Sequence, residues 1–298
     1  MTWLLWLGSI LCLVTVAAVG LSVYGDRRWT DAAQLPWGKL EAGRIDGKRD
    51  EKPLPQRYDA RELEGLPAPV QRYFRAVLKD GQPIITAVTI DMAGTFNMAG
   101  TFNMSATGEQ WKPFTSRQRV TTRRPGFLWD ASIAMAPGLK VRVVDSYIAG
   151  LGLLHATIQG LFTVAEMRGE GEIARGEFMR WFAEVAWYPT ALLPSQGVRW
   201  EAVDDHSANA TVVDGPLALT LLFRFNDASL LGSFRAEARG GMVGEKMVMA
   251  PWEGIWSNYQ TRDGIQVPFT GEVAWVRPEG RKPYFIGTVT ALTYEFAP

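Results

Sequence analysis

The sequence predicts an α+β fold: a large curved antiparallel sheet of about ten strands, half-barrel-like, with about three helices packed on one face. Polar and apolar residues alternate over most of 84–148 and 198–296, the period of half-buried strands. Short connections join consecutive strands, which makes them antiparallel neighbours and argues against βαβ units. Two segments, 66–78 and 172–187, have the helical period instead.

The N-terminus carries an apolar run that predicts a transmembrane helix. Residues Trp3–Tyr24 contain no charge, and a helix of this length spans roughly 30 Å, the thickness of the hydrocarbon core. A cleaved signal peptide is the alternative, but no Lys or Arg precedes the run and the run is long for one. We therefore expect residues 1–25 to be a single-pass anchor in the cell membrane. Arg27 and Arg28 follow the run and, by the positive-inside rule, favour a body on the cytoplasmic side. Asp26 weakens this signal, so the side of the membrane on which the body lies stays open.

Residues 26–58 follow with mixed charge, three prolines and no apolar periodicity, so we expect a linker there. A single α+β domain is expected over 59–298. Its first element is a helix that carries an apolar stripe and ends at Asp80-Gly81. The stripe consists of Val70, Tyr73, Phe74, Val77 and Leu78.

The strand region after residue 84 contains a perfect tandem hexapeptide, MAGTFN at 92–97 and again at 98–103. Because six is even, the second copy keeps every side chain on the same face. The repeat either lengthens a hairpin or forms an adhesive edge strand. Turns are expected at 124–126 and 136–138. The apolar segment 151–168, interrupted by Gly160, is expected to form one helix or two short pieces.

The segment 172–187 is expected to be a second amphipathic helix, joined by a proline-bounded turn to the strands of the C-terminal half. One of its faces carries Phe178, Trp181, Phe182 and Val185. Another carries Glu177, Arg180 and Glu184. Beyond residue 198, hairpin turns are expected at Asp214-Gly215, Asn226-Asp227 and Asp263-Gly264.

Composition argues against several classes of function. Lys+Arg and Asp+Glu are both 31, and this balance argues against nucleic acid as a partner. The one cysteine, Cys12, lies in the apolar run, so the body has no disulfide, cysteine zinc site or cysteine nucleophile. His155 and His206 are far apart in sequence, and no metal site is expected. No phosphate-binding glycine loop occurs, and no cofactor is expected.

Three carboxylates are the candidate catalytic groups. Asp130 and Glu201 each adjoin a tryptophan on a predicted strand, and Asp204 lies in a predicted turn. A pair about 5–10 Å apart would support a hydrolase, since glycoside hydrolysis uses two such groups. Because strand neighbours point to opposite faces, the alternative is that these acids face solvent.

Two groups of side chains are candidate ligand contacts. Arg117 and Arg119 share a strand face and would hold an anionic head group, unless they form surface ion pairs. A set of large apolar residues would contact a ligand between the sheet and the helices, unless it fills the core. That set is Trp129, Met135, Trp181, Trp187 and Trp200.

Six short motifs occur in order along the chain: LPAPVQRYFR (66–75), WKPF (111–114), PGFLWDA (125–131), MAPG (135–138), LLPSQGVRWE (192–201) and PWEG (251–254). Together they resemble a bacterial family catalogued only as a domain of unknown function, from about residue 60 to the C-terminus. The resemblance implies a bacterial protein, often membrane-anchored, with no assigned activity. The tandem MAGTFN departs from the family pattern, which has one copy.

The expected architecture is also similar to the half-barrel of periplasmic lipoprotein carriers and related lipid-binding lipoproteins. We therefore predict a membrane-anchored domain that binds an apolar or amphiphilic, lipid-like ligand. A carboxylate-dependent hydrolase and a membrane-associated scaffold are the alternatives.

Overall fold

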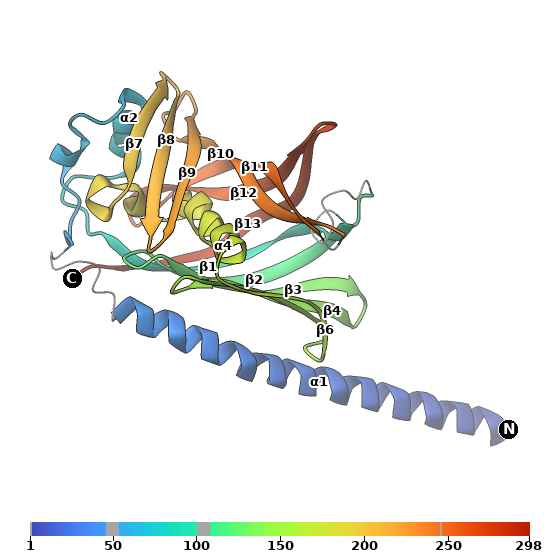
Figure 1. Ribbon diagram of the computed structural model, residues 1–298. Helices are drawn as coiled ribbons and strands as arrows, with labels where there is room; N and C mark the ends of the chain where they lie inside the picture. Colours follow the sequence, from blue (N-terminus) through green and yellow to red (C-terminus); the bar gives the residue numbers. More distant parts are fainter. Residues whose placement is uncertain (1, 46–53, 100–107, 245) are drawn as a thin grey trace.

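The computed structural model describes residues 2–45, 54–99, 108–244 and 246–298 (Figure 1). Over these residues it contains a 13-stranded open antiparallel sheet in the order β6-β5-β4-β3-β2-β1-β13-β12-β11-β10-β9-β8-β7. The strands are β1 (Ile85–Asn97), β2 (Trp111–Thr121), β3 (Gly126–Ala136), β4 (Leu139–Ile148), β5 (Leu151–Ile158), β6 (Phe162–Gly169), β7 (Arg199–Asp204), β8 (Ser207–Asp214), β9 (Leu217–Phe225), β10 (Leu231–Val243), β11 (Lys246–Arg262), β12 (Ile265–Arg277) and β13 (Gly280–Phe296). The predicted fold class is confirmed, with more strands than expected.

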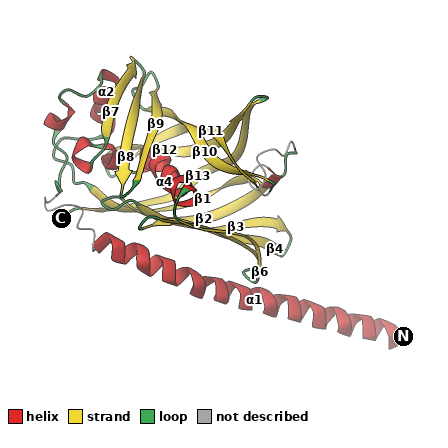
Figure 2. Ribbon diagram, in the orientation of Figure 1, coloured by secondary structure: helices red, strands yellow, loops and turns green. Residues whose placement is uncertain are grey.

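The helices are few and lie on both sides of this sheet (Figure 2). They are α1 (Thr2–Ile45), α2 (Ala68–Val77) and α4 (Glu172–Ala183), with 3-10 turns at Ala60–Leu63, Glu184–Trp187, Pro189–Leu192 and Pro194–Gln196. The apolar stripe of α2 is buried as predicted. α4 contacts β3–β6 and also β9 and β10, so the sheet curves around it. α1 instead lies along the outside, against β2, β3 and β4.

The expected helix over 151–168 is wrong: this segment forms the β5–β6 hairpin. A continuous apolar run has no periodicity that separates a buried helix from a strand. Two features favour the hairpin. Gln159 and Gly160 take positive φ values of 55° and 72° at its turn. Gly152 lies against the backbone of α4, where a Cβ atom would come within 2.8 Å of the Ile173 carbonyl carbon.

Helical structure continues past the apolar run into the segment expected to be a linker. α1 extends to Ile45, and from Gly25 onward one side of it packs on the sheet. Trp29 and Leu40 are buried there against Leu128 and Val144. The sequence did not predict the burial of these two residues, because charged residues surround them and they are too widely spaced to form an apolar stripe. The first half of α1 is long and apolar enough to cross a membrane.

The predicted turns lie where the sequence places them. Asp263 and Gly264 both have positive φ, 49° and 80°, between the paired residues Arg262 and Ile265. That is the geometry of a type I′ hairpin.

Of the tandem hexapeptide, residues 92–97 lie in β1, which has a neighbour on either side, and residues 100–103 lie outside the described residues. The two interpretations of the repeat stay predictions.

Candidate functional site

A cavity of about 180 Å³ lies between α4 and the concave face of the sheet. Among its 23 described lining residues, nine are aromatic, three are methionines and five are charged. The lining residues include Phe96, Trp129, Asp145, Glu177, Arg180, Glu184, Trp187, Arg239, Met242, Met247, Trp252, Trp256, Val273, Trp275 and Tyr284. These side chains come from both halves of the sheet and from α4, so the site forms only when the sheet curves.

The apolar wall consists of aromatic pairs in favourable geometry. Trp187 meets Trp256 edge to face at 4.7 Å between centroids, and Trp275 stacks on Tyr284 at 6.0 Å. Gly271 makes room for this packing, because a Cβ atom there would lie 2.5 Å from the Trp256 ring. Substitution at Gly271 would therefore displace the indole that forms one side of the cavity.

Arg180 forms the centre of a buried polar cluster on α4. Its Nε donates to Glu184 Oε1 at 2.9 Å and its Nη2 to Gln118 Oε1 at 3.0 Å, while Nη1 pairs with Asp145. The guanidinium also lies 4.8 Å from the centre of the Trp129 ring. Burial opposes its charge, but the carboxylates of Glu184 and Asp145 outweigh this and raise the pKa of Arg180. Arg180 is a permanent cation that neutralises two acids.

Glu177, one turn before Arg180, is the unusual acid of the site. It is 8% exposed, and burial followed by the negative charge of Asp145 raises the pKa of Glu177 well above its ordinary value. Oε2 of Glu177 and Oδ1 of Asp145 have no donor among the described residues. A proton on Glu177 resolves this, since the carboxyl can then donate to Asp145. The site therefore favours Glu177 in its neutral form.

Arg239 brings a second guanidinium to the cavity from β10. It lies 4.1 Å over the Trp252 ring and forms no ion pair with a carboxylate among the described residues, although its charge opposes part of the rise in the pKa of Glu177. Trp252 in turn donates from Nε1 to the Tyr284 hydroxyl at 3.0 Å. Arg239 is thus held by a ring and not by an acid, which leaves its donors available to an anion.

The replacement Glu177→Gln is expected to remove a pH dependence of stability. In the unfolded chain this carboxyl titrates near 4.5, whereas the folded protein keeps its proton to higher pH. Above that value the unfolded state binds fewer protons, so the free energy of unfolding falls as pH rises. The variant, whose amide can donate to Asp145, should lose less Tm than the wild type between about pH 5 and about pH 8.

Thermal unfolding of the full chain in detergent at a series of pH values measures this difference. Glu201→Gln is the matched control, because Glu201 is exposed on β7 and its replacement should leave the slope unchanged. Parallel curves for wild type and Glu177→Gln would contradict the assignment of a neutral Glu177.

The predicted apolar contacts divide into two groups. Trp129 and Trp187 line the cavity. Trp181 and Trp200 lie in the core away from it, each with its Nε1 donating to a backbone carbonyl, of Thr121 and Leu192 respectively. Met135 is half-buried against the core and does not line the cavity.

The predicted anion contacts, Arg117 and Arg119, do not line the cavity but form ion pairs on the face of the sheet that α1 covers, which is the alternative given for them. Arg117 is exposed, 3.8 Å from Asp91. Arg119 is buried between the sheet and α1, where it pairs with Glu41 at 2.8 Å and Glu295 at 2.6 Å. The two side chains share a strand face as predicted, but α1 covers only Arg119. Arg119 therefore fixes α1 on the sheet.

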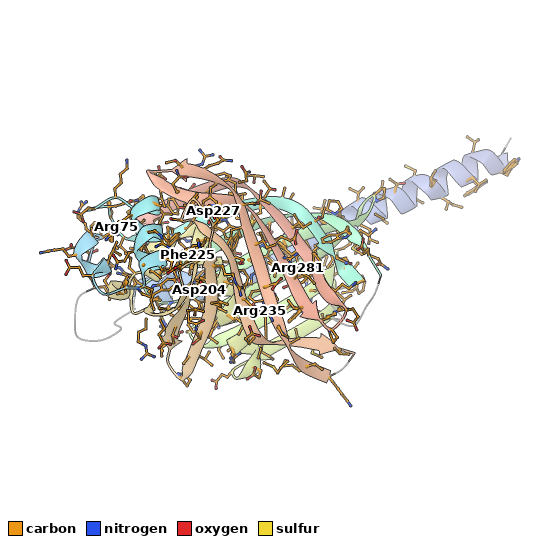
Figure 3. All side chains as sticks on the ribbon, turned by 90° about the horizontal axis from the view of Figure 1, so that it is seen from above. Arg75, Asp204, Phe225, Asp227, Arg235 and Arg281 are labelled. Atoms are coloured by element: carbon orange, nitrogen blue, oxygen red, sulfur yellow. The ribbon has the colours of Figure 1, made fainter. Side chains whose placement is uncertain are left out.

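The three candidate catalytic carboxylates do not form a common site. Asp130 faces α1 and accepts a hydrogen bond from Trp29 Nε1 at 2.9 Å. Glu201 is exposed on the edge strand β7. Asp204 caps the β7–β8 turn by accepting from the His206 amide, which lowers the pKa of Asp204. Figure 3 shows Asp204 toward the end of the body that carries Arg75 of α2.

Neither histidine joins these acids. His155 lies on β5, not on the expected helix, and stacks on Trp29 with 5.7 Å between the ring centroids. Among the residues that the structure describes, no group of three His, Cys, Asp or Glu side chains could hold a metal ion.

The charged residues of the cavity were not predicted as a site from the sequence. The spacing Glu177, Arg180, Glu184 was visible as one face of a helix, but a charged face normally points to water. Arg239 and Trp252 lie on β10 and β11, far along the chain from α4, and gave no local signal.

Among solved structures, the chain is similar to a LolA superfamily protein from Nitrosomonas europaea, with 9% identity and a TM-score of 0.40, over 77% of this chain and 93% of that chain. It is also similar to a β-barrel-like DUF1849 protein from Brucella abortus, with 9% identity and a TM-score of 0.23, over 71% of this chain and 99% of that chain. A search of the curated proteins finds no match. The model of a family of unknown function, DUF6920, matches residues 64–294, which confirms the kind of family that the motifs predicted.

Proposed function

The chain belongs to DUF6920, a family of unknown function, and we propose that it binds an amphiphilic, lipid-like molecule in the cavity beneath α4. The observation that carries the proposal is the composition of this cavity. An aromatic and methionine wall surrounds Arg239, a guanidinium without a carboxylate partner among the described residues, and Glu177, a carboxyl that favours its neutral form. The wall suits an apolar chain, and Arg239 suits an anionic head group.

The size of the cavity limits how much of such a molecule it encloses. Pockets for drug-sized ligands measure about 300–1,000 Å³, and this one measures about 180 Å³. The site therefore accommodates a single acyl chain or part of one, with the head group near Arg239. A fatty acid or a lipid with one chain inserted fits this description.

We further propose that α1 anchors the protein in the membrane through residues 3–24. Every described side chain in this stretch except Ser22 is exposed, and the helix reaches a mean hydropathy of 2.1 over 18 residues. Such a surface is stable in lipid and unfavourable in water. The protein would then hold its cavity close to a supply of amphiphiles.

Binding is tested with the full chain in mild detergent and a fluorescent long-chain fatty acid, cis-parinaric acid, as probe. Val273→Phe puts a ring into a cavity of only about 180 Å³ and is expected to weaken binding by more than about tenfold, because the ring occupies space that the ligand needs. Ile255→Phe is the matched control, since Ile255 is exposed outside the cavity on the neighbouring strand β11.

Native mass spectrometry of the wild-type chain after gentle extraction checks for a co-purified lipid. Equal probe affinity in both variants, with no retained lipid in the wild type, would contradict the proposed site.

A further inference from the structure

The apolar half of α1 ends at the place where the helix meets two hairpin turns of the sheet. Gly25, directly after Tyr24, touches the β5–β6 turn so closely that a Cβ atom on Gly160 would lie 2.4 Å from the Gly25 carbonyl oxygen. Asp26 pairs with Lys140 at 2.8 Å, just beyond the β3–β4 turn. The level at which α1 would leave a bilayer is therefore also the level of these two turns.

Both turns carry apolar side chains that the protein leaves exposed. Phe162 follows the β5–β6 turn and is 63% exposed, and Val164 on the same strand is 50% exposed. Leu139 follows the β3–β4 turn and is 43% exposed. Exposure of these apolar side chains to water is unfavourable, whereas contact with a bilayer would remove all of them from water.

The same end of the sheet carries a second exposed apolar segment. In an antiparallel sheet alternate hairpin turns emerge at the same end, so the β10–β11 and β12–β13 turns lie at the end of the β3–β4 turn. Met247, Val248 and Met249 are exposed directly after the β10–β11 turn. Exposed Lys246 and Lys282 flank these turns and suit anionic lipid head groups. Figure 1 shows the apolar half of α1 extending past this end of the sheet.

The cavity lies at this end too. Met242 and Met247 of its wall flank the β10–β11 turn, and Trp275 and Tyr284 flank the β12–β13 turn. Phe96 is one residue from the end of β1. A molecule that enters the cavity between these strands would pass the exposed hairpin residues first.

We propose that this end of the sheet rests on the bilayer surface, with Leu139, Phe162, Val164 and Met247–Met249 as its lipid contacts. The occupant of this surface is a lipid bilayer, because the exposed residues continue the uncharged surface of α1 at the level where its charges begin. Resting on the proposed function, the arrangement lets an amphiphile move between bilayer and cavity without crossing water.

Membrane depth tests the contact directly. Single cysteines for an environment-sensitive fluorophore are placed at Phe162→Cys, Val248→Cys and Asp227→Cys, in the full chain carrying Cys12→Ser. Asp227 is the control, since it is exposed in the β9–β10 turn at the other end of the sheet. In vesicles of phosphatidylcholine and phosphatidylglycerol, the first two labels should shift their emission to shorter wavelength and be quenched by nitroxide-labelled lipid.

The label at Asp227→Cys should remain in water. Emission from Phe162→Cys or Val248→Cys that matches the Asp227→Cys control would overturn the proposed contact, even where the protein still binds cis-parinaric acid. If the proposed ligand site is wrong instead, the protein will not bind cis-parinaric acid although the labels keep their depth in the membrane. The two proposals can therefore be rejected separately.

Transfer kinetics give a second readout. The double variant Phe162→Asp, Val248→Asp should take up cis-parinaric acid from vesicles more slowly than the wild type, while its affinity for the probe in detergent stays the same. Neither residue lines the cavity. Unchanged transfer rates would count against the bilayer contact.

Discussion

Replacing Arg180 with alanine is expected to destabilise the protein by about 3–5 kcal/mol, because it leaves buried acids without their cation. Arg180 is the shared partner of Asp145 and Glu184, whose side chains are 9% and 13% exposed. Without the guanidinium, both carboxylates must either stay charged in a nonpolar surrounding or take up protons. Urea denaturation of the full chain in detergent measures the change.

The control for this variant is a second arginine in ion pairs that water reaches. Arg235→Ala removes contacts to Glu237 and Glu253, and Glu237 is 75% exposed, so its expected effect is about 0–1 kcal/mol. If both variants lose the same free energy of unfolding, burial does not make the Arg180 ion pairs more important for stability than the exposed ones.

Trp29→Ala is expected to release the second half of α1 from the sheet, at a cost of about 3–5 kcal/mol to the docked state. The indole is buried at the interface, donates to Asp130 and stacks on His155, and the guanidinium of Arg142 lies 5.6 Å from its ring centre. Its removal leaves a cavity and takes away the hydrogen-bond donor to Asp130, which among the described residues keeps only its ion pair with Arg142 at 3.5 Å. The body has its own core elsewhere and should stay folded.

Hydrogen exchange of the α1 amides and trypsin cleavage at Arg27 and Arg28 report this local release. Both rates should rise strongly in Trp29→Ala. Trp6→Ala is the matched control, because Trp6 lies in the apolar half of the helix and is 71% exposed. Protection of α1 that is unchanged in Trp29→Ala would contradict the role of Trp29 as an anchor.

The local signals of the sequence were sufficient for most of the sheet. Turn chemistry at Asp263-Gly264 and strand alternation act over a few residues, so they can be recognised without the rest of the fold. The segment 151–168 failed because its apolar run fits a buried helix and a buried strand equally well. Pairing with β4, which only the tertiary structure supplies, decides for the strand.

The site was less predictable than the fold. Trp129 and Trp187 could be proposed because large apolar and aromatic side chains line most ligand pockets, but Trp181 and Trp200 have the same signal and lie in the core. Glu177 and Arg180 become meaningful only because the sheet curves around α4 and covers both of its faces. That closure joins β3–β6 to β9 and β10, a long-range contact that no short pattern encodes.

The continuity of α1 has a mechanical consequence. The helix is uninterrupted from Trp3 to Trp29, and Trp29 is buried against the sheet, so the two halves cannot pivot independently. A membrane helix changes its tilt to match the thickness of the bilayer. In a bilayer, a change in thickness would therefore rotate the whole sheet and alter how far its hairpins reach toward the lipid.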